Sequence, residues 1–155
     1  MDEYQQLIAR LGLELNVPDM TPDEDGYLML QIDEQIVHMQ VDADADALIL
    51  YAILHQVESD RQLEIYARLL TANTFWHETG GATLSIDAAS SHVLICRSLS
   101  LRVLDEPTLE TALARFTDTV NHWETWLTAA NAGGAIYPGN DQPGFPIPVA
   151  AIALA

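Results

Sequence analysis

The feature that most constrains this chain is a helical pattern over residues 59–76, which has apolar residues on two of its sides. One row consists of Leu63, Tyr66 and Leu70, and the other of Ile65, Leu69, Ala72 and Trp76. Ser59 and Gln62 have the spacing of a capping box, which predicts the start of the helix. A surface helix needs only one apolar stripe to pack on a core. The second row therefore favours a helix shared between the core and a partner over one buried inside the domain.

The rest of the chain is predicted to form strands and two further helices. Alternating or continuous apolar runs indicate strands, and apolar residues three and four apart indicate helices. The predicted elements are a helix at 2–12, strands at 27–32, 35–41 and 47–55, the helix at 59–76, strands at 82–87 and 92–96, and a helix capped by Asp105. These elements predict an α+β fold, with an antiparallel five-stranded sheet and three helices in the order α-β-β-β-α-β-β-α.

Four local features refine this prediction. Gly12 is placed to end the first helix, and Gly80-Gly81 suit a tight bend before the second hairpin. The run 47–55 is apolar at nearly every position, which predicts a strand covered on both faces. Arg97 interrupts the apolar alternation of the last strand, and this predicts either a bulge or an arginine whose charged head reaches water.

Composition divides the chain into a domain and a tail. Residues 1–128 are predicted to form a single α+β domain, which is long enough to build a core. Residues 129–155 contain Gly133-Gly134, Pro138-Gly139 and Pro143-Gly144, and such breaks interrupt regular structure. We therefore expect residues 129–155 to form a flexible or loosely docked tail that is dispensable for folding.

The chain is strongly acidic, with 23 Asp and Glu against six Arg, no Lys and a formal net charge of −17. This charge repels phosphate backbones and anionic membranes, so neither nucleic acid nor membrane is an expected partner. It fits a basic protein partner, or simply a solvated acidic surface. The N-terminus lacks the pattern of a signal peptide, and no run has the length of a membrane span. Cys96 is the single cysteine, which excludes an internal disulfide and fits a cytoplasmic protein.

No motif in the sequence argues for catalysis, a metal or a cofactor. The five histidines lack HExxH or comparable spacing, and there is no GxSxG elbow, Walker loop or GxGxxG. Asp42, Asp44 and Asp46 have the spacing of carboxylates in some calcium loops, but the glycine and glutamate that such loops need are absent. Cys96 lies among apolar residues, which predicts an inert packing thiol. No catalytic residue, metal or cofactor is therefore expected.

The positive signals are apolar surfaces, which on an acidic domain indicate protein partners. The doubled pattern on the helix at 59–76 predicts a homodimer. The predicted dimer-interface residues are Leu69, Ala72, Phe75 and Trp76. The first helix and the first hairpin have more apolar residues than a solvated face needs. The partner-binding residues predicted there are Leu7, Ile8, Leu11, Tyr27, Met29, Ile36 and His38.

An ordered set of local motifs runs through residues 4–127. The motifs are Leu11-Gly12-Leu13, Asp25-Gly26, Leu69-Leu70-Thr71-Ala72-Asn73, Gly80-Gly81-Ala82-Thr83-Leu84-Ser85-Ile86-Asp87, Val93-Leu94-Ile95-Cys96-Arg97 and Leu104-Asp105-Glu106-Pro107. With the order of elements, the small size and the acidic balance, they resemble the class I type III secretion chaperones of the Tir-chaperone (CesT-like) family. The tail after Thr128 departs from the short C-terminus that is usual in that family.

The resemblance implies a cytoplasmic bacterial homodimer without enzymatic activity. Such chaperones bind the N-terminal chaperone-binding segment of a secreted effector in extended form, keep it competent for secretion and deliver it to the secretion apparatus. An extended client can add a strand to a sheet edge and place alternate side chains in apolar pockets. The surface predicted from the first helix and hairpin would be the client-binding surface.

Two other classes of function stay open at this point. The first is a small dimeric α+β enzyme or ligand-binding module, which a deep pocket with a strongly shifted titratable group would favour. The second is an acidic mimic that blocks a nucleic-acid-binding protein, which competition with DNA for a basic partner would support.

Overall fold

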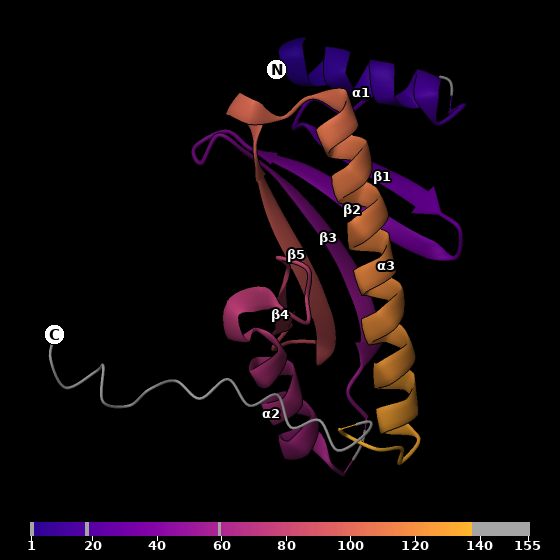
Figure 1. The fold of residues 1–155 in the computed structure, drawn as a ribbon, viewed down its shortest axis with the longest axis vertical. Helices are drawn as coiled ribbons and strands as arrows, with labels where there is room; N and C mark the ends of the chain where they lie inside the picture. The colour runs from indigo at the N-terminus through magenta and orange to yellow at the C-terminus, as the bar shows by residue number, and fades with distance from the viewer. Residues whose placement is uncertain (1, 18, 59, 138–155) are drawn as a thin grey trace, which may run out of the picture.

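The computed structural model describes residues 2–17, 19–58 and 60–137, which form a five-stranded antiparallel sheet and three α-helices. The elements are α1 (Asp2–Glu14), β1 (Tyr27–Ile32), β2 (Gln35–Asp42), β3 (Ala47–Gln56), α2 (Gln62–Ala72), the 3-10 turn η1 (Thr74–Trp76), β4 (Thr83–Ile86), β5 (His92–Ser100), the 3-10 turn η2 (Leu101–Val103) and α3 (Glu106–Asn131). The strands lie in the order β1-β2-β3-β5-β4. The predicted α+β class and the order of elements are confirmed (Figure 1).

Helix α3 organises the core. Asp105 caps it as predicted, because its Oδ1 accepts a hydrogen bond from Thr108 N at 3.0 Å. The helix runs across one face of the sheet, and Phe116 and Trp123 are fully buried beneath it. Helix α1 lies across the upper end of the molecule (Figure 1) and also packs on α3. The apolar stripe of α3 therefore faces the core, as its spacing predicted.

The role predicted for Gly12 is wrong. Helix α1 continues to Glu14, so Gly12 is an interior helical residue. The loop after the helix folds back onto it, and Val17 N donates to Gly12 O at 2.8 Å. A Cβ at position 12 would lie 2.8 Å from Val17 O and 3.0 Å from Met20 Cβ. Gly12 is therefore needed for a close approach of the backbone rather than for a helix end.

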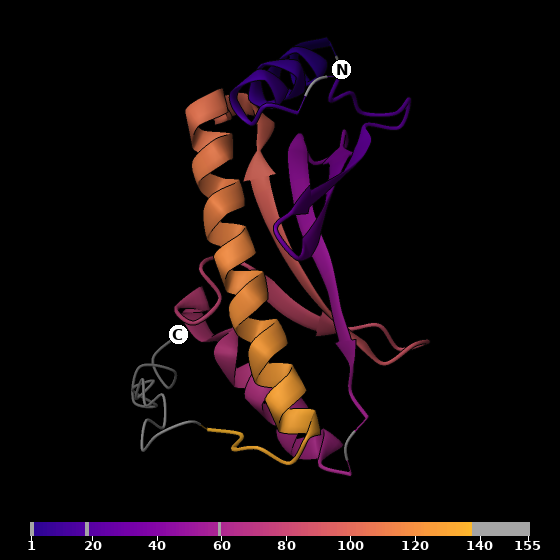
Figure 2. The same ribbon diagram turned by 90° about the vertical axis from the view of Figure 1, so that its right-hand side faces the viewer.

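The prediction for β3 is wrong, and of the two alternatives predicted for Arg97 in β5 the bulge is excluded. Strand β3 is covered on one face only, where Leu48, Leu50, Ala52 and Leu54 are buried, whereas Ile53 on the other face is exposed. The reason is that α2 and α3 both lie on the same side of the sheet, with no helix of the described residues on the other side (Figure 2). Strand β5 has no bulge at Arg97, which pairs with Leu50 in regular register.

The helix predicted at 59–76 is shorter. Helix α2 begins at Gln62 after Arg61, and no side chain caps it; the Ser59 half of the predicted capping box lies outside the described residues. The helix ends at Ala72, and η1 follows with Phe75 and Trp76 at φ of 53° and 55°. In one predicted row Ile65, Leu69 and Ala72 are buried and Trp76 is exposed, whereas in the other Leu63 and Leu70 are exposed and Tyr66 is half-buried.

The predicted tail begins too early. Helix α3 continues to Asn131, and the chain then turns back so that Ile136 is buried. Trp126 Nε1 donates to Ile136 O at 3.1 Å, which fixes this segment to the helix. Residues 129–137 therefore belong to the fold. The rest of the predicted tail, 138–155, lies outside the described residues. No helix in the described part of the chain is long and apolar enough to cross a membrane.

Candidate functional site

The candidate site is the face of the sheet turned away from α3, which we call the outer face. Side chains alternate between the two faces of a strand, so the strand register assigns each residue to a face. The outer-face residues are Tyr27, Met29 and Gln31 on β1, Ile36, His38 and Gln40 on β2, Ile49, Tyr51 and Ile53 on β3, Leu94, Cys96 and Ser98 on β5, and Thr83 and Ser85 on β4. No helix of the described residues lies over this face (Figure 2).

The outer face has no ionised side chain across its middle. None of its residues given above is Asp, Glu or Arg, although the chain has 23 acidic residues. A charged position, Asp42, is reached only at the end of β2. Met29, Ile36 and Ile53 are 56%, 48% and 55% exposed. An apolar, charge-free face on so acidic a protein is typical of a surface that another chain covers.

A stack of three rings lies at the centre of the outer face. The ring of His38 lies between those of Tyr27 and Tyr51, with centroid distances of 6.0 and 4.6 Å. The Tyr27 hydroxyl and His38 Nδ1 are hydrogen-bonded at 2.8 Å. Burial lowers the pKa of His38 below its usual range and raises the pKa of Tyr51, so both rings are held in their neutral forms.

A cross-strand row extends from this stack to the end of α2. Met29 pairs with His38, His38 with Tyr51, and Tyr51 with Cys96. Cys96 pairs in turn with Thr83, whose Oγ1 accepts a hydrogen bond from Trp76 Nε1 at 3.3 Å. Burial raises the pKa of the Cys96 thiol, which keeps it protonated. The row therefore connects the first hairpin to η1 across the whole sheet.

The structure separates the seven residues predicted to bind a partner into two groups. Leu7, Ile8 and Leu11 are buried in the core under α1, so they are not accessible in this protomer. The other four, Tyr27, Met29, Ile36 and His38, all lie on the outer face. Sequence reasoning missed Tyr51, because the apolar run 47–55 gave no period that could assign its residues to faces.

Sequence comparison identifies the family of the chain. A model of the Tir chaperone protein (CesT) family matches residues 6–124. The chain belongs to this family. The function that the family and the fold support is therefore that of a type III secretion chaperone, as the motifs predicted. A protein of Chlamydia pneumoniae is 26% identical over 112 residues, which are 72% of this chain and 82% of that protein.

Solved structures show the same chaperone fold. The ExsC–ExsE complex contains a chain with a TM-score of 0.71 and 22% identity, over 81% of this chain and 94% of that chain. A chain of the HopA1–SchA chaperone–effector complex has a TM-score of 0.66 and 20% identity, over 79% of this chain and 93% of that chain. The structure of the Yersinia pestis type III secretion chaperone SycH, in complex with a fragment of YscM2, has a TM-score of 0.60 and 19% identity. The match covers 77% of this chain and 98% of that chain.

The two outer strands of this CesT-family sheet have different edges. On β1, Tyr27 O accepts from Asp23 N at 2.9 Å, so the backbone groups of Tyr27 point away from β2. Backbone groups of alternate residues point to the same edge, so those of Met29 and Gln31 also point outward. Strand β4 is capped instead, because the Asn73 side chain bonds to both backbone groups of Leu84. The edge of β1 therefore has outward backbone groups at Met29 and Gln31 for an added strand, whereas those of Leu84 on the β4 edge are already bonded.

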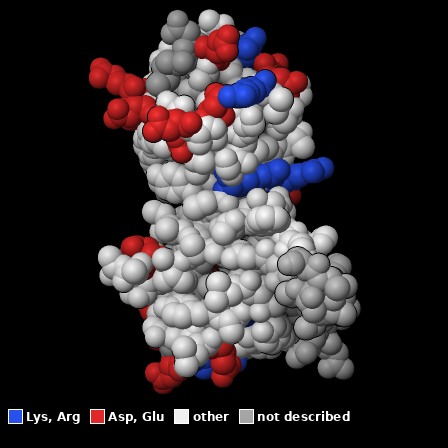
Figure 3. Space-filling model, turned by 90° about the vertical axis from the view of Figure 1, so that its left-hand side faces the viewer, with Lys and Arg blue, Asp and Glu red and all other residues white. Residues whose placement is uncertain are grey.

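The residues predicted for the dimer interface are also divided. Leu69 and Ala72 are buried inside the protomer, whereas Phe75 and Trp76 are 59% and 52% exposed. The accessible apolar residues of α2 are Leu63 and Leu70, at 84% and 70%, which belong to the first predicted row; its third member, Tyr66, is half-buried. On the side of the molecule that includes β4 and η1, acidic side chains gather mainly toward the two ends (Figure 3).

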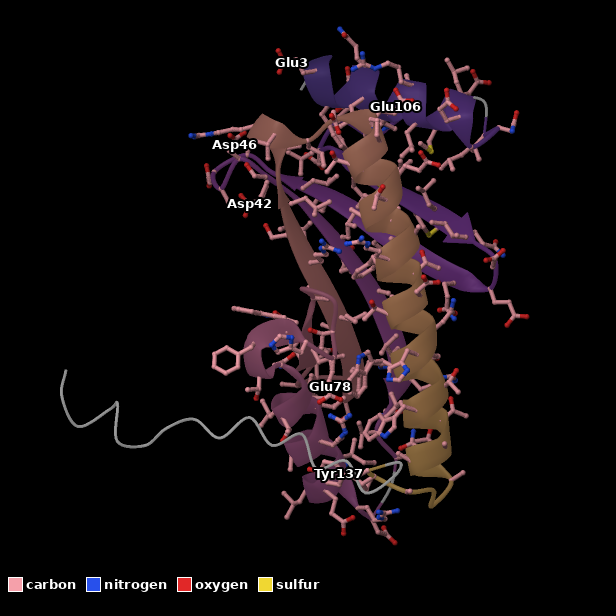
Figure 4. The ribbon with its side chains drawn as sticks, viewed as in Figure 1. Glu3, Asp42, Asp46, Glu78, Glu106 and Tyr137 are labelled. Atoms are coloured by element: carbon pink, nitrogen blue, oxygen red, sulfur yellow. The ribbon has the colours of Figure 1, made fainter. Side chains whose placement is uncertain are left out.

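A hollow of about 850 Å³ lies away from the outer face, between α1, η2 and the start of α3. Arg10 and Arg102, which line it, pair with Glu106 at 3.9 Å and Asp46 at 2.6 Å, and Figure 4 shows both acids near the upper end. Tyr4 lines the hollow too. Burial is the main cause that raises its pKa, and the negative charge of the nearby Asp23 raises it further. The hollow thus contains ion pairs and a neutral tyrosine. Among the described residues, no group of three or more His, Cys, Asp or Glu could hold a metal.

Proposed function

We propose that this chain is a non-enzymatic homodimeric chaperone of the bacterial cytoplasm. It holds the N-terminal segment of a secreted effector in extended form on the outer face and presents the complex to the secretion apparatus. The observation that carries the proposal is the charge-free, apolar outer face, left open on a chain with a net charge of −17. Membership of the CesT family and the likeness to chaperone complexes support it.

The geometry suits an extended client. A strand added to the free edge of β1 pairs with the outward backbone groups of Met29 and Gln31. Alternate side chains of that strand then lie beside Met29 and Gln31, while Ile36 on β2 and the stacked rings support the segments that continue over the sheet. Backbone pairing supplies affinity for many sequences, and the apolar contacts select among them. The client does not need a core of its own, which favours later unwinding.

The proposed dimer uses the exposed row of α2. In a two-fold contact the same patch lies on both copies, so each charged group near the axis meets its own like charge. Between Ile65 and His77 the only charged residue is Arg68, which is buried and paired with Glu78. This stretch exposes Leu70 on the helix, with Phe75 and Trp76 beyond its end, and Leu63 lies two turns earlier on the same side, beside the Arg61–Glu64 ion pair. It can therefore meet a second copy without charge repulsion.

Client binding is tested by placing a charge on the open face. Met29→Asp and Ile36→Asp should melt within a few degrees of the native chain, because both positions are exposed. Binding of an effector's N-terminal segment, identified by copurification from the bacterial host and then purified, should weaken by about tenfold or more. Leu13→Asp is the matched control, since Leu13 is exposed on α1 away from this face. Unchanged binding by both variants would refute the assignment of the outer face.

The dimer is tested by light scattering at low micromolar concentration. The native chain should give twice the mass of the 17.1 kDa protomer. Leu63→Asp with Leu70→Asp should give a folded monomer, because these side chains make little contact within the protomer. A native chain that stays monomeric would exclude the dimer and leave the client-binding face to be judged separately.

A further inference from the structure

Two aromatic residues are held in an unfavourable backbone conformation on the surface. Phe75 and Trp76 have φ of 53° and 55°, in the left-handed region that non-glycine residues rarely occupy. Both side chains are more than half exposed, so burial of the rings does not explain the conformation. Such strain persists only where the surroundings fix the backbone, and it is common at functional sites.

The turn that follows fixes this conformation from one side. Trp76 N donates to Asn73 O at 3.1 Å, and Trp76 O accepts from Thr79 N at 3.3 Å and from Gly81 N at 3.4 Å. Gly80 and Gly81 both have positive φ, which lets the chain reverse at this point. The backbone carbonyl of Trp76 is thus held by two amides of its own turn.

Arg68 fixes the same turn from the protein interior. Its side chain is buried, and the guanidinium lies 5.0 Å from the ring centroid of Trp123 and 5.4 Å from that of Tyr137. It forms an ion pair with Glu78, whose backbone O accepts from Trp123 Nε1 at 3.2 Å. Figure 4 shows Glu78 and Tyr137 at the lower part of the molecule, near α2 and the end of α3. Arg68 therefore joins α2, α3, the segment after α3 and the turn.

We propose that Arg68 is a positioning residue for dimerisation. Through Glu78 it holds the turn at residues 73–81, so that Phe75 and Trp76 form a rigid aromatic anchor for a second copy of this chain. The inference rests on the dimer proposed above. A second copy is the occupant because the anchor continues the charge-free, exposed row of α2. A rigid anchor raises affinity, since binding then loses less conformational entropy.

The first arm of the test removes both charges together. Arg68→Met with Glu78→Gln avoids leaving one buried charge unpaired, and such a replacement is often tolerated by the fold. We expect the melting temperature to stay within a few degrees. Hydrogen exchange at the Thr79 and Gly81 amides should accelerate by about tenfold, and the dimer dissociation constant should rise by a similar factor, while amides of β2 keep their protection. Unchanged exchange or an unchanged dissociation constant would overturn the inference.

The second arm removes the anchor and keeps its support. Trp76→Ala should weaken the dimer by about tenfold or more, as is common for a central aromatic residue. Adding Trp76→Ala to the double variant should weaken the dimer by a smaller factor than Trp76→Ala does in the native chain, because both changes act on one contact. Fully additive losses would mean that Arg68 does not act through the anchor. A monomeric native chain would refute the dimer and this inference together, whereas a native dimer indifferent to these variants would refute only the inference.

Discussion

The side chain of Asn73 pairs with the backbone of Leu84 as a neighbouring strand would. Its Oδ1 accepts from Leu84 N at 2.9 Å, and its Nδ2 donates to Leu84 O at 3.0 Å. Exposed strand edges invite pairing with other chains, and proteins commonly cover them. One amide side chain at the end of α2 therefore occupies the outward backbone groups of Leu84 and disfavours strand addition at the β4 edge.

Replacing Asn73 by Leu should both destabilise the protein and open this edge. Loss of the two hydrogen bonds leaves the Leu84 backbone groups without partners, at a cost of about 1–3 kcal/mol in the free energy of unfolding. Chemical denaturation measures that cost, and light scattering should detect species larger than the dimer. Asn73→Asp keeps the hydrogen-bond acceptor and loses the donor, so its free energy of unfolding should lie between those of the native chain and Asn73→Leu. Equal stability of all three would show that the pairing contributes nothing.

Truncation should locate the true end of the domain. A chain ending at Thr128 loses the buried Ala130 and Ile136 and leaves the Trp126 indole without its acceptor. We expect it to be destabilised by several kcal/mol, since losing one buried Ile side chain costs about 2–5 kcal/mol. A chain ending at Tyr137 should melt like the full chain. Equal melting temperatures for the two truncated chains would mean that residues 129–137 add no stability.

Acidification should destabilise the protein partly through His38. Burial lowers its pKa in the folded state, so the unfolded chain binds the proton more readily as the pH falls through about 6.5. The stability contributed by neutral His38 is present above that pH and is lost as the pH falls toward the folded-state value. The decrease in melting temperature between pH 7 and pH 5 should be smaller for His38→Gln. His122→Gln, at an exposed position on α3, controls for loss of a histidine. An identical decrease in melting temperature for the native chain, His38→Gln and His122→Gln would contradict the prediction.

Gly12→Ala should destabilise the protein although the position is helical. Alanine is favoured over glycine inside a helix by about 1 kcal/mol. Its Cβ would lie 2.8 Å from Val17 O, which belongs to backbone and cannot rotate away. We expect the clash to exceed the gain and lower the stability by about 1–3 kcal/mol, measured by urea denaturation. Ala9→Gly, at an exposed position of α1, measures the difference in helix propensity between alanine and glycine without a clash. A Gly12→Ala chain that is more stable than the native chain would disprove the close approach.

Local sequence patterns predicted the elements well where one period dominates. The hairpin β4–β5 alternates in polarity, and the stripe of α3 has a clear helical spacing. The cap at Asp105 was predictable because its bond to Thr108 N is only three residues away. In each case the information that fixes the structure lies within one element or one turn.

The remaining features depend on contacts between distant residues. Both faces of β3 are apolar, so the sequence could not show that Leu50 is buried and Ile53 is exposed. The burial of Leu7, Ile8 and Leu11 under α1 depends on where that helix packs. Phe75 and Trp76 carry no local signal for positive φ, and Glu78 of the same turn bonds to Trp123, which lies 45 residues later in α3.

The charge-free surfaces have a consequence for the rate at which copies meet. Two chains of net charge −17 repel each other at distances comparable to the Debye length, about 10 Å at 0.1 M salt. Repulsion is weakest when the neutral stretch around Leu70 and Trp76 faces the other copy. The acidic rest of the surface therefore favours encounters in which the two copies approach through this stretch. Added salt should accelerate self-association, whereas it slows encounter with a basic partner. The sign of the salt effect on the association rate therefore distinguishes a second copy from a basic client.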